Sequence, residues 1–272
     1  MHLDYLKIIA FKSDWRFAAA NLRLRHQIRN FGLDFECYTP RSIQESSPGF
    51  FKYLKSIRDT NPNGFGLWAW KPFIINHAAQ RLPDHSLLLY VDIGCDFIPT
   101  SNFINYVEAF RKSSFDLCSL PVSERTGAVA RFGSEEERWS TQSLINYLEL
   151  DSRDIQSPQY RATWILVKIS PHSRQLLKNW LSLIEFNDGE LLREHSLAGN
   201  KLVHSRFDQS ILSCLIKKSM RAGHIRISPE YSTNIGNSIW CTRNFTLYPP
   251  LKNTFSRRIQ DSLFNKLLKN RH

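Results

Sequence analysis

Two carboxylates directly follow a strongly apolar segment in the first half of the chain. Residues 86–91 read SLLLYV, and Asp92, Gly94 and Asp96 come after them. A carboxylate at the end of a buried strand needs a partner, because burying it unpaired costs free energy. A divalent ion such as Mn²⁺ or Mg²⁺, bound together with ligand phosphates, is one suitable partner, and ribose hydroxyls or backbone donors are others. We predict that Asp92 and Asp96 bind a metal ion and that a ligand approaches the main chain at Gly94. The alternative is that Asp92 caps the next element and Gly94 forms a turn.

A third acid, Asp208, lies in the segment SRFDQS, residues 205–210. It is a candidate for a catalytic carboxylate. The spacing from Ser205 also fits a capping box, in which the acid at the third helical position returns to the amide of the cap residue. The local sequence leaves both interpretations open.

These acids lie within an alternation of predicted strands and helices. Residues 5–11 and 34–40 have the apolar, β-branched character of strands, and residues 14–32 repeat apolar side chains at helical spacing. This order predicts a βαβ unit with parallel strands. The pattern continues with a turn-rich connection at 41–66, a helix from Pro72 to Pro83, the strand at 86–91, a helix at 101–112 and a strand at 115–122. A doubly wound sheet follows, and such sheets bind ligands at the carboxyl ends of their strands.

The second half of the chain is less regular. Predicted strands lie at 161–170 and 224–228, and predicted helices at 141–150, 171–186 and 205–220. Residues 134–139, SEEERW, are expected to form an exposed acidic patch.

The composition is that of a globular protein with excess positive charge. Hydrophobic residues make up 42% of the 272, and 36 Lys and Arg against 25 Asp and Glu give a net charge of +11. This balance favours an anionic partner, but no nucleic-acid-binding motif is present and we expect no nucleic acid. Five scattered cysteines show no disulfide or zinc spacing. With no recognisable signal peptide or membrane-spanning run, we expect a cytoplasmic protein with reduced thiols.

The last segment differs in composition from the rest. Residues 251–272 contain six Lys or Arg and one Asp, and their apolar side chains recur on one helical face. A basic amphipathic helix of this kind can bind an anionic membrane surface. The alternative is a terminal helix packed on the protein's own core. We predict a domain at 1–247 and a helical tail at 248–272.

Residues 64–97, GFGLWAWKPFIINHAAQRLPDHSLLLYVDIGCDF, resemble a group of bacterial glycosyltransferases of the GT-A fold. The shared pattern is an aromatic glycine turn, W-x-W-K-P, a helix, and an apolar strand that ends in D-x-G-C-acid. Weaker resemblances are FKSDW around Ser13, the Q-x-x-A strand through Gln159 and Ala162, and the D-Q-S motif at residues 208–210. The likeness covers roughly residues 5–240, and the tail lies outside it.

The resemblance implies a single GT-A domain, Rossmann-like, with a mixed central sheet flanked by helices. It also implies roles for individual residues. Donor-binding residues would be Ser13, Lys71, Asp92, Gly94 and Asp96, substrate-binding residues Trp70, Gln159 and Arg206, and catalytic residues Asp208 and Gln209. One departure is that the common D-x-D signature is replaced by Asp92-Ile93-Gly94. Either Asp96 supplies the second metal ligand, or Lys and Arg alone hold the diphosphate.

The function implied by the resemblance is transfer of a hexose from a nucleotide-diphosphate sugar, a UDP-sugar in particular. The acceptor would be a surface glycan or a lipid-linked saccharide of the lipopolysaccharide type, reached from the inner face of the cell membrane. Alternatives are a non-catalytic sugar-nucleotide binder and a nucleic-acid-binding protein. A nucleotidyltransferase is disfavoured, because the segment after the first predicted strand lacks a glycine-rich phosphate loop.

Overall fold

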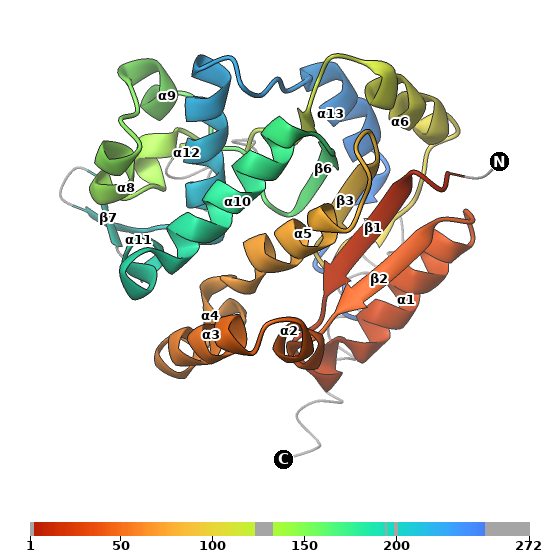
Figure 1. The fold of residues 1–272 in the computed structure, drawn as a ribbon, viewed down its shortest axis with the longest axis horizontal. Coiled ribbons are helices and arrows are strands. Elements are labelled where there is room, and N and C mark those ends of the chain that lie inside the picture. The colour runs from red at the N-terminus through yellow and green to blue at the C-terminus, as the bar shows by residue number, and fades with distance from the viewer. Residues whose placement is uncertain (1–2, 123–132, 194, 199–200, 248–272) are drawn as a thin grey trace, which may run out of the picture.

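A central sheet of five strands organises the computed structural model, which describes residues 3–247 apart from 123–132, 194 and 199–200 (Figure 1). The strand order is β2 (Asp34–Tyr38), β1 (Leu6–Phe11), β3 (Leu87–Val91), β6 (Trp164–Lys168) and β5 (Leu117–Cys118). Strand β1 pairs in parallel with β2 and β3, whereas β6 is antiparallel to β3 and β5. The predicted α/β class with a mixed central sheet is confirmed.

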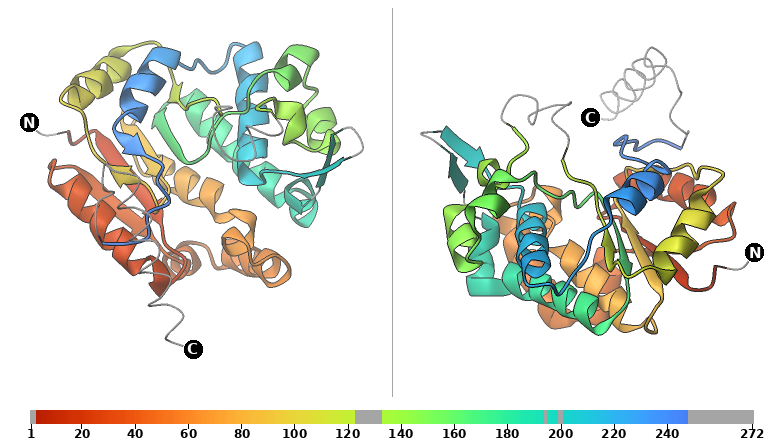
Figure 2. Two further views of the ribbon diagram at one scale, coloured as in Figure 1. Left: turned by 180° about the vertical axis from the view of Figure 1, so that it is seen from behind. Right: turned by 90° about the horizontal axis from the view of Figure 1, so that it is seen from above.

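Helices cover both faces of this sheet, which explains why its central strand, β3, is apolar and buried throughout. One face carries α5 (Trp70–Gln80), α10 (Pro171–Glu185) and α12 (Asp208–Arg221). The other carries α1 (Ala18–Arg29), α6 (Phe103–Lys112) and α13 (Pro229–Gly236). In β3, Leu88 and Tyr90 face the first layer, while Leu87, Leu89 and Val91 face the second. Figure 2 shows the two layers from behind and from above.

Several predicted elements differ from those in the structure. The strand expected at 115–122 shortens to β5, and beyond it Pro121 forms only an isolated bridge, to Tyr160. The prediction of a strand at 224–228 is wrong, because Ile227 alone in this segment forms a bridge, an isolated one to Leu117. The turn-rich connection at 41–66 contains two helices, α2 (Pro40–Ser46) and α3 (Pro48–Thr60), each with a proline in its first turn and a Thr or Ser cap.

Short elements connect the layers. They are α4 (Gly64–Leu67), β4 (Asp96–Phe97), η2 (Glu136–Arg138), α8 (Gln142–Tyr147), α9 (Ser152–Gln156), η3 (Phe186–Gly189), α11 (Glu190–Arg193), the hairpin β7 (His195–Ala198) and β8 (Lys201–His204), and β9 (Ile239–Trp240). A short 3₁₀ turn, η1 (Trp15–Phe17), precedes α1 and is capped by Asp14.

The predicted tail lies outside the described residues, so the division at residue 247 stays a prediction. Among the helices that the structure describes, none has both the length and the apolar character needed to span a bilayer.

Candidate functional site

Three of the predicted site residues meet at one place although they are far apart in the sequence. The Lys71 ammonium lies 3.0 Å from Asp208 Oδ2 and 3.5 Å from Asp92 Oδ1. Lys71 and Asp208 are buried, whereas the side chain of Asp92 is 34% exposed. Asp92 follows the carboxyl end of β3, the edge where a sheet of this kind binds ligands. In this cluster of Lys71, Asp92 and Asp208, the Asp92 carboxylate can therefore contact a ligand, while the two buried groups hold that carboxylate in position.

A strained turn places Lys71 at the start of α5. Phe65, Leu67 and Trp68 all have positive φ angles of 54–60°, a conformation that non-glycine residues rarely adopt. Gly64 also has positive φ, and a Cβ at this position would lie 2.3 Å from the Trp68 ring. The turn ends at Trp70, so that Lys71 lies in the first turn of the helix. Strain of this kind is retained where the surrounding structure over-determines it, often at functional sites.

The same turn contacts the segment that carries Asp208. The rings of Trp68 and Phe207 stack with centroids 6.0 Å apart, and Phe207 has a φ of +51°. Asp208 is then the first residue of α12, and its carbonyl accepts a hydrogen bond from Trp180 Nε1 at 3.1 Å. The two aromatic rings thus hold the Lys71 and Asp208 segments together.

The capping-box interpretation of Asp208 is wrong. Because α12 begins at Asp208, this residue does not occupy the third helical position. Ser205 Oγ accepts from the amide of Phe207 at 3.0 Å, and no side chain caps the helix. The carboxylate of Asp208 instead points to Lys71, which a local pattern could not reveal.

The Lys71 ammonium is fully engaged by the protein. Its three N–H bonds have three acceptors within reach, namely the carboxylates of Asp208 and Asp92 and the carbonyl oxygen of Ala162 at 3.1 Å. Burial lowers the pKa of Lys71, but Asp208 and Asp92 outweigh burial and the pKa is raised. We therefore describe Lys71 as a charged residue that positions the two acids.

The two acids differ in their surroundings. Burial raises the pKa of Asp208 to about 6, against the lowering effect of Lys71. Asp92 Oδ1 accepts a short hydrogen bond from the Tyr90 hydroxyl, whose pKa burial raises well above its usual value. Asp208 is thus close to a protonation change near neutral pH.

Asp96, the second predicted metal ligand, lies in a different environment from Asp92. It is fully buried and forms an ion pair with Arg23 Nε at 2.8 Å. Arg23 belongs to α1, which covers the sheet face opposite to the one covered by α5 and α12. The oxygens of Asp96 also accept from Gln27 Nε2 at 2.9 Å and from Thr242 Oγ1 at 2.6 Å. A carboxylate with this many protein donors does not fit a cation shared with Asp92.

Within the described ranges, no group of three or more His, Cys, Asp or Glu side chains is arranged to hold a metal. A magnesium or manganese ion on a nucleotide needs only one or two carboxylates, so metal dependence stays a prediction. Asp92 is the one of the two predicted ligands that retains solvent exposure.

The protein's own chain closely approaches the main chain at Gly94, and the predicted approach of a ligand there stays a prediction. A Cβ on Gly94 would lie 2.9 Å from the Phe245 ring and 3.2 Å from Arg243 Cα. The Gly94 carbonyl accepts from the amide of Asn244 at 2.8 Å. The glycine is needed because residues 243–245 cross the turn between Asp92 and Asp96.

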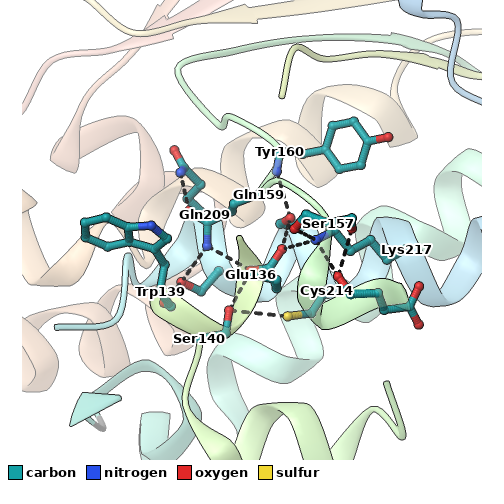
Figure 3. Close-up of polar contacts among 12 residues, drawn as sticks. Glu136, Trp139, Ser140, Ser157, Gln159, Tyr160, Gln209, Cys214 and Lys217 are labelled. Carbon is teal, nitrogen blue, oxygen red and sulfur yellow. Dashed lines mark hydrogen bonds and ion pairs between the residues drawn. The ribbon is translucent and has the colours of Figure 1, made fainter. Parts of the chain in front are cut away.

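The side chains of Gln159, which is buried, and Gln209, which is partly buried, contact each other (Figure 3). Gln209 Nε2 donates to Gln159 Oε1 at 2.6 Å, and Gln209 Oε1 accepts from the amide of Ala162 at 3.2 Å. Ala162 in turn presents its carbonyl to Lys71. Both glutamines therefore fix the main chain that binds Lys71.

Glu136 contacts Gln159, and no pattern in the sequence predicted that it belongs to this network. It is fully buried and pairs with Lys217 at 2.9 Å, which contradicts the exposed acidic patch predicted at 134–139. Ser140 Oγ and Gln159 Nε2 donate to Glu136 Oε1 at 2.6 and 2.8 Å, and Ser213 donates to Oε2. Figure 3 shows this network extending from Lys217 to Gln209.

The remaining predicted residues lie apart from the three-residue cluster or support it. Trp70 is buried, stacks on Phe11 with ring centroids 4.0 Å apart, and donates from Nε1 to the Gly64 carbonyl at 2.8 Å. Ser13 donates to Asp14 at 2.9 Å just after β1. The Arg206 guanidinium lies 3.9 Å from the centre of the Trp139 ring. Their predicted ligand contacts stay predictions.

No family model and no curated protein matches this chain. Among solved structures, one similar protein is a glycosyltransferase involved in the glycosylation of the major capsid of PBCV-1, with 13% identity, 67% of each chain covered and a TM-score of 0.36. Another is mouse xyloside xylosyltransferase 1 in its apo form, with 9% identity, 82% of this chain and 83% of that chain covered, and a TM-score of 0.42. Similarities this weak carry no argument about the activity of this chain.

Proposed function

We propose that this protein is a glycosyltransferase of the GT-A type that uses a nucleotide-sugar donor. The observation that carries the proposal is the meeting of Lys71, Asp92 and Asp208 at the carboxyl end of β3. Each comes from a different segment of the sequence resemblance, namely W-x-W-K-P, D-x-G-C-acid and D-Q-S. A resemblance in sequence alone does not require these residues to share one place.

In this proposal Asp92 contacts the donor. Its carboxylate is the most exposed group of the cluster and can accept a hydrogen bond from a ribose or sugar hydroxyl. Lys71 and Asp208 hold it in position from the buried side. A fixed negative charge at this edge would also stabilise the positive charge that develops on the sugar as its bond to the diphosphate breaks.

We further propose that the donor is a UDP-hexose and that the acceptor is a surface glycan or a lipid-linked saccharide. The sequence resemblance supports both statements. The second candidate function, a sugar-nucleotide binder without activity, is favoured by the departure from D-x-D and by the engagement of Asp96 with Arg23.

The test is calorimetric titration of UDP and GDP, each with and without Mn²⁺, followed by an assay of UDP-sugar hydrolysis. We expect UDP to bind and the Asp92→Ala variant to bind it at least about tenfold more weakly. Binding that requires Mn²⁺ would support a metal on Asp92, whereas binding without it would assign the diphosphate to basic side chains. A folded protein that binds neither nucleotide would contradict the proposal.

The composition of residues 251–272 supports a second proposal, binding to an anionic membrane surface. Removal of these residues should abolish sedimentation with vesicles that contain phosphatidylglycerol and leave UDP binding unchanged. Such sedimentation should also weaken with salt. Undiminished sedimentation of the shortened chain would contradict this proposal.

A further inference from the structure

The diphosphate of a nucleotide-sugar donor needs positive charge, and Lys71 does not supply it. The acceptors around its ammonium are already Asp208, Asp92 and the Ala162 carbonyl. This inference rests on the proposed function, because it concerns the same donor. The question is which other cations lie beside Asp92.

The main-chain contacts of the site bring Arg161 and Arg243 to the turn that begins with Asp92. The Asp92 amide donates to the carbonyl of Thr163 at 2.8 Å, two residues after Arg161. On the other side, Arg243 Cα would lie 3.2 Å from a Cβ on Gly94. The two arginines therefore flank residues 92–94 from different segments of the chain.

Arg206 reaches the same place through Gln209. The amide of Gln209 donates to the Arg206 carbonyl at 3.0 Å, and the Gln209 side chain accepts from the amide of Ala162, the residue after Arg161. The Arg206 guanidinium is fixed against the Trp139 ring at 3.9 Å, a geometry that holds an arginine in place without a carboxylate.

None of the three arginines forms an ion pair with an acid in the part of the chain that the structure describes. The acids of this region pair with other basic side chains: Asp92 and Asp208 pair with Lys71, Asp96 with Arg23, and Glu136 with Lys217.

The three arginines are accessible to a ligand, because Arg243 is exposed and Arg161 and Arg206 are partly exposed. Burial, joined by the positive charges of Arg161 and Arg243, lowers the pKa of Arg206 to about 10 against the opposing effect of Glu136. Three cations that repel one another favour an anion between them.

We propose that Arg161, Arg206 and Arg243 form the binding site for the diphosphate group of the donor. Arginine suits this role because its planar fork donates two parallel hydrogen bonds to a phosphate. A diphosphate held there lies next to Asp92, so that the nucleotide or sugar attached to it meets the exposed carboxylate. In this arrangement the arginines neutralise the negative charge of the diphosphate, a role that a metal ion bound by a D-x-D signature would otherwise have. The absence of the second acid from that signature is then explained.

The test is calorimetric titration of inorganic pyrophosphate and of UDP with the full-length protein, without added metal. The Arg161→Ala and Arg243→Ala variants should each weaken binding of both ligands by about tenfold or more, because each loses a charge-assisted hydrogen bond. The Arg161→Lys and Arg243→Lys variants should recover part of the loss, because they keep the charge without the fork. Thermal unfolding identifies any variant that fails to fold.

The matched control is Arg29→Ala, an exposed arginine in the last turn of α1, at the opposite end of the sheet. It removes the same charge and should leave binding within about twofold of the wild type. Equal weakening by Arg29→Ala, or unchanged binding in the Arg161→Ala/Arg243→Ala double variant, would overturn the site.

The two proposals fail separately. Sugar transfer by a protein whose pyrophosphate binding ignores the arginines would contradict only the arginine site. Arginine-dependent pyrophosphate binding without turnover of any UDP-sugar, GDP-sugar or other nucleotide-sugar tested would leave the anion site in place and contradict the transferase.

Discussion

Two buried lysine–carboxylate pairs lie in the same layer of the molecule, and they differ in how completely their charges are satisfied. Glu136 pairs with Lys217 at 2.9 Å and also accepts hydrogen bonds from Ser140, Ser213 and Gln159. Asp208 pairs with Lys71 at 3.0 Å, and in the described part of the chain its paired oxygen makes no hydrogen bond beyond that ion pair.

The difference separates a pair that serves the fold from one that is suited to chemistry. Removing one partner of a buried pair leaves an uncompensated charge, so such a pair contributes to the stability of the fold. The less satisfied Asp208 has a pKa of about 6 and responds to nearby charge. Perturbed acids of this kind cluster at functional sites, although structural pairs can show the same feature.

The largest expected effect is on stability. Glu136→Ala should lower the free energy of unfolding by about 3–5 kcal/mol, because the buried Lys217 ammonium loses its carboxylate and keeps only the carbonyls of Asp154 and Ser157. Urea denaturation measures this, with the partly exposed neighbour Glu137→Ala as the control. The Glu136→Ala/Lys217→Met double variant should recover much of the loss. A loss of less than about 1 kcal/mol in the free energy of unfolding would contradict this prediction, because it is typical of exposed ion pairs.

The next effect is on activity. If Asp92 contacts the donor as proposed, Lys71→Met should reduce UDP-sugar turnover by about 100-fold, because the Asp92 carboxylate loses its position and charge balance. The exposed Lys52→Met serves as the control. Loss of the ammonium should also raise the pKa of Asp208 above 6, since Lys71 lowers that pKa in the wild type. Full activity in Lys71→Met would show that this pair, like the other, is structural.

The pair of Asp208 and Lys71 should also make stability depend on pH. The pKa of Asp208 is raised from 3.8 to about 6 in the folded chain, so that the folded state binds this proton more tightly than the unfolded state. Lowering the pH from 7 to 4 should therefore stabilise the wild type relative to Asp208→Asn. Over the same range sugar transfer should fall as the acid loses its charge. A stability difference that does not change with pH would contradict the raised pKa.

The smallest effect concerns the link between the two pairs. Gln159→Leu removes hydrogen bonds to Glu136 and Gln209 and should cost about 1–2 kcal/mol of unfolding free energy. Turnover should fall about tenfold, because Gln209 then holds the main chain at Ala162 less firmly. The exposed Gln156→Leu is the matched control. Loss of stability without loss of turnover would show that the two pairs act independently.

The sequence by itself determined the elements that carry the site. Alternating strands and helices, the apolar β3 and the start of α5 near Pro72 follow from local periodicity and from proline chemistry. The acids that end a buried strand also mark a site without a structure, because such groups need partners.

Only the tertiary structure decided which partners they have. Arg23 of α1 pairs with Asp96 of the adjacent β4. Glu136 pairs with the buried Lys217, and the Asp208 carboxylate contacts Lys71 and does not cap its helix. Each of these pairings joins segments far apart in the sequence, so no local pattern distinguishes a paired acid from an exposed one. Whether a charge is bound by the protein or left for a ligand depends on packing between elements, and Arg161 and Arg243 acquire their position beside Asp92 in the same way.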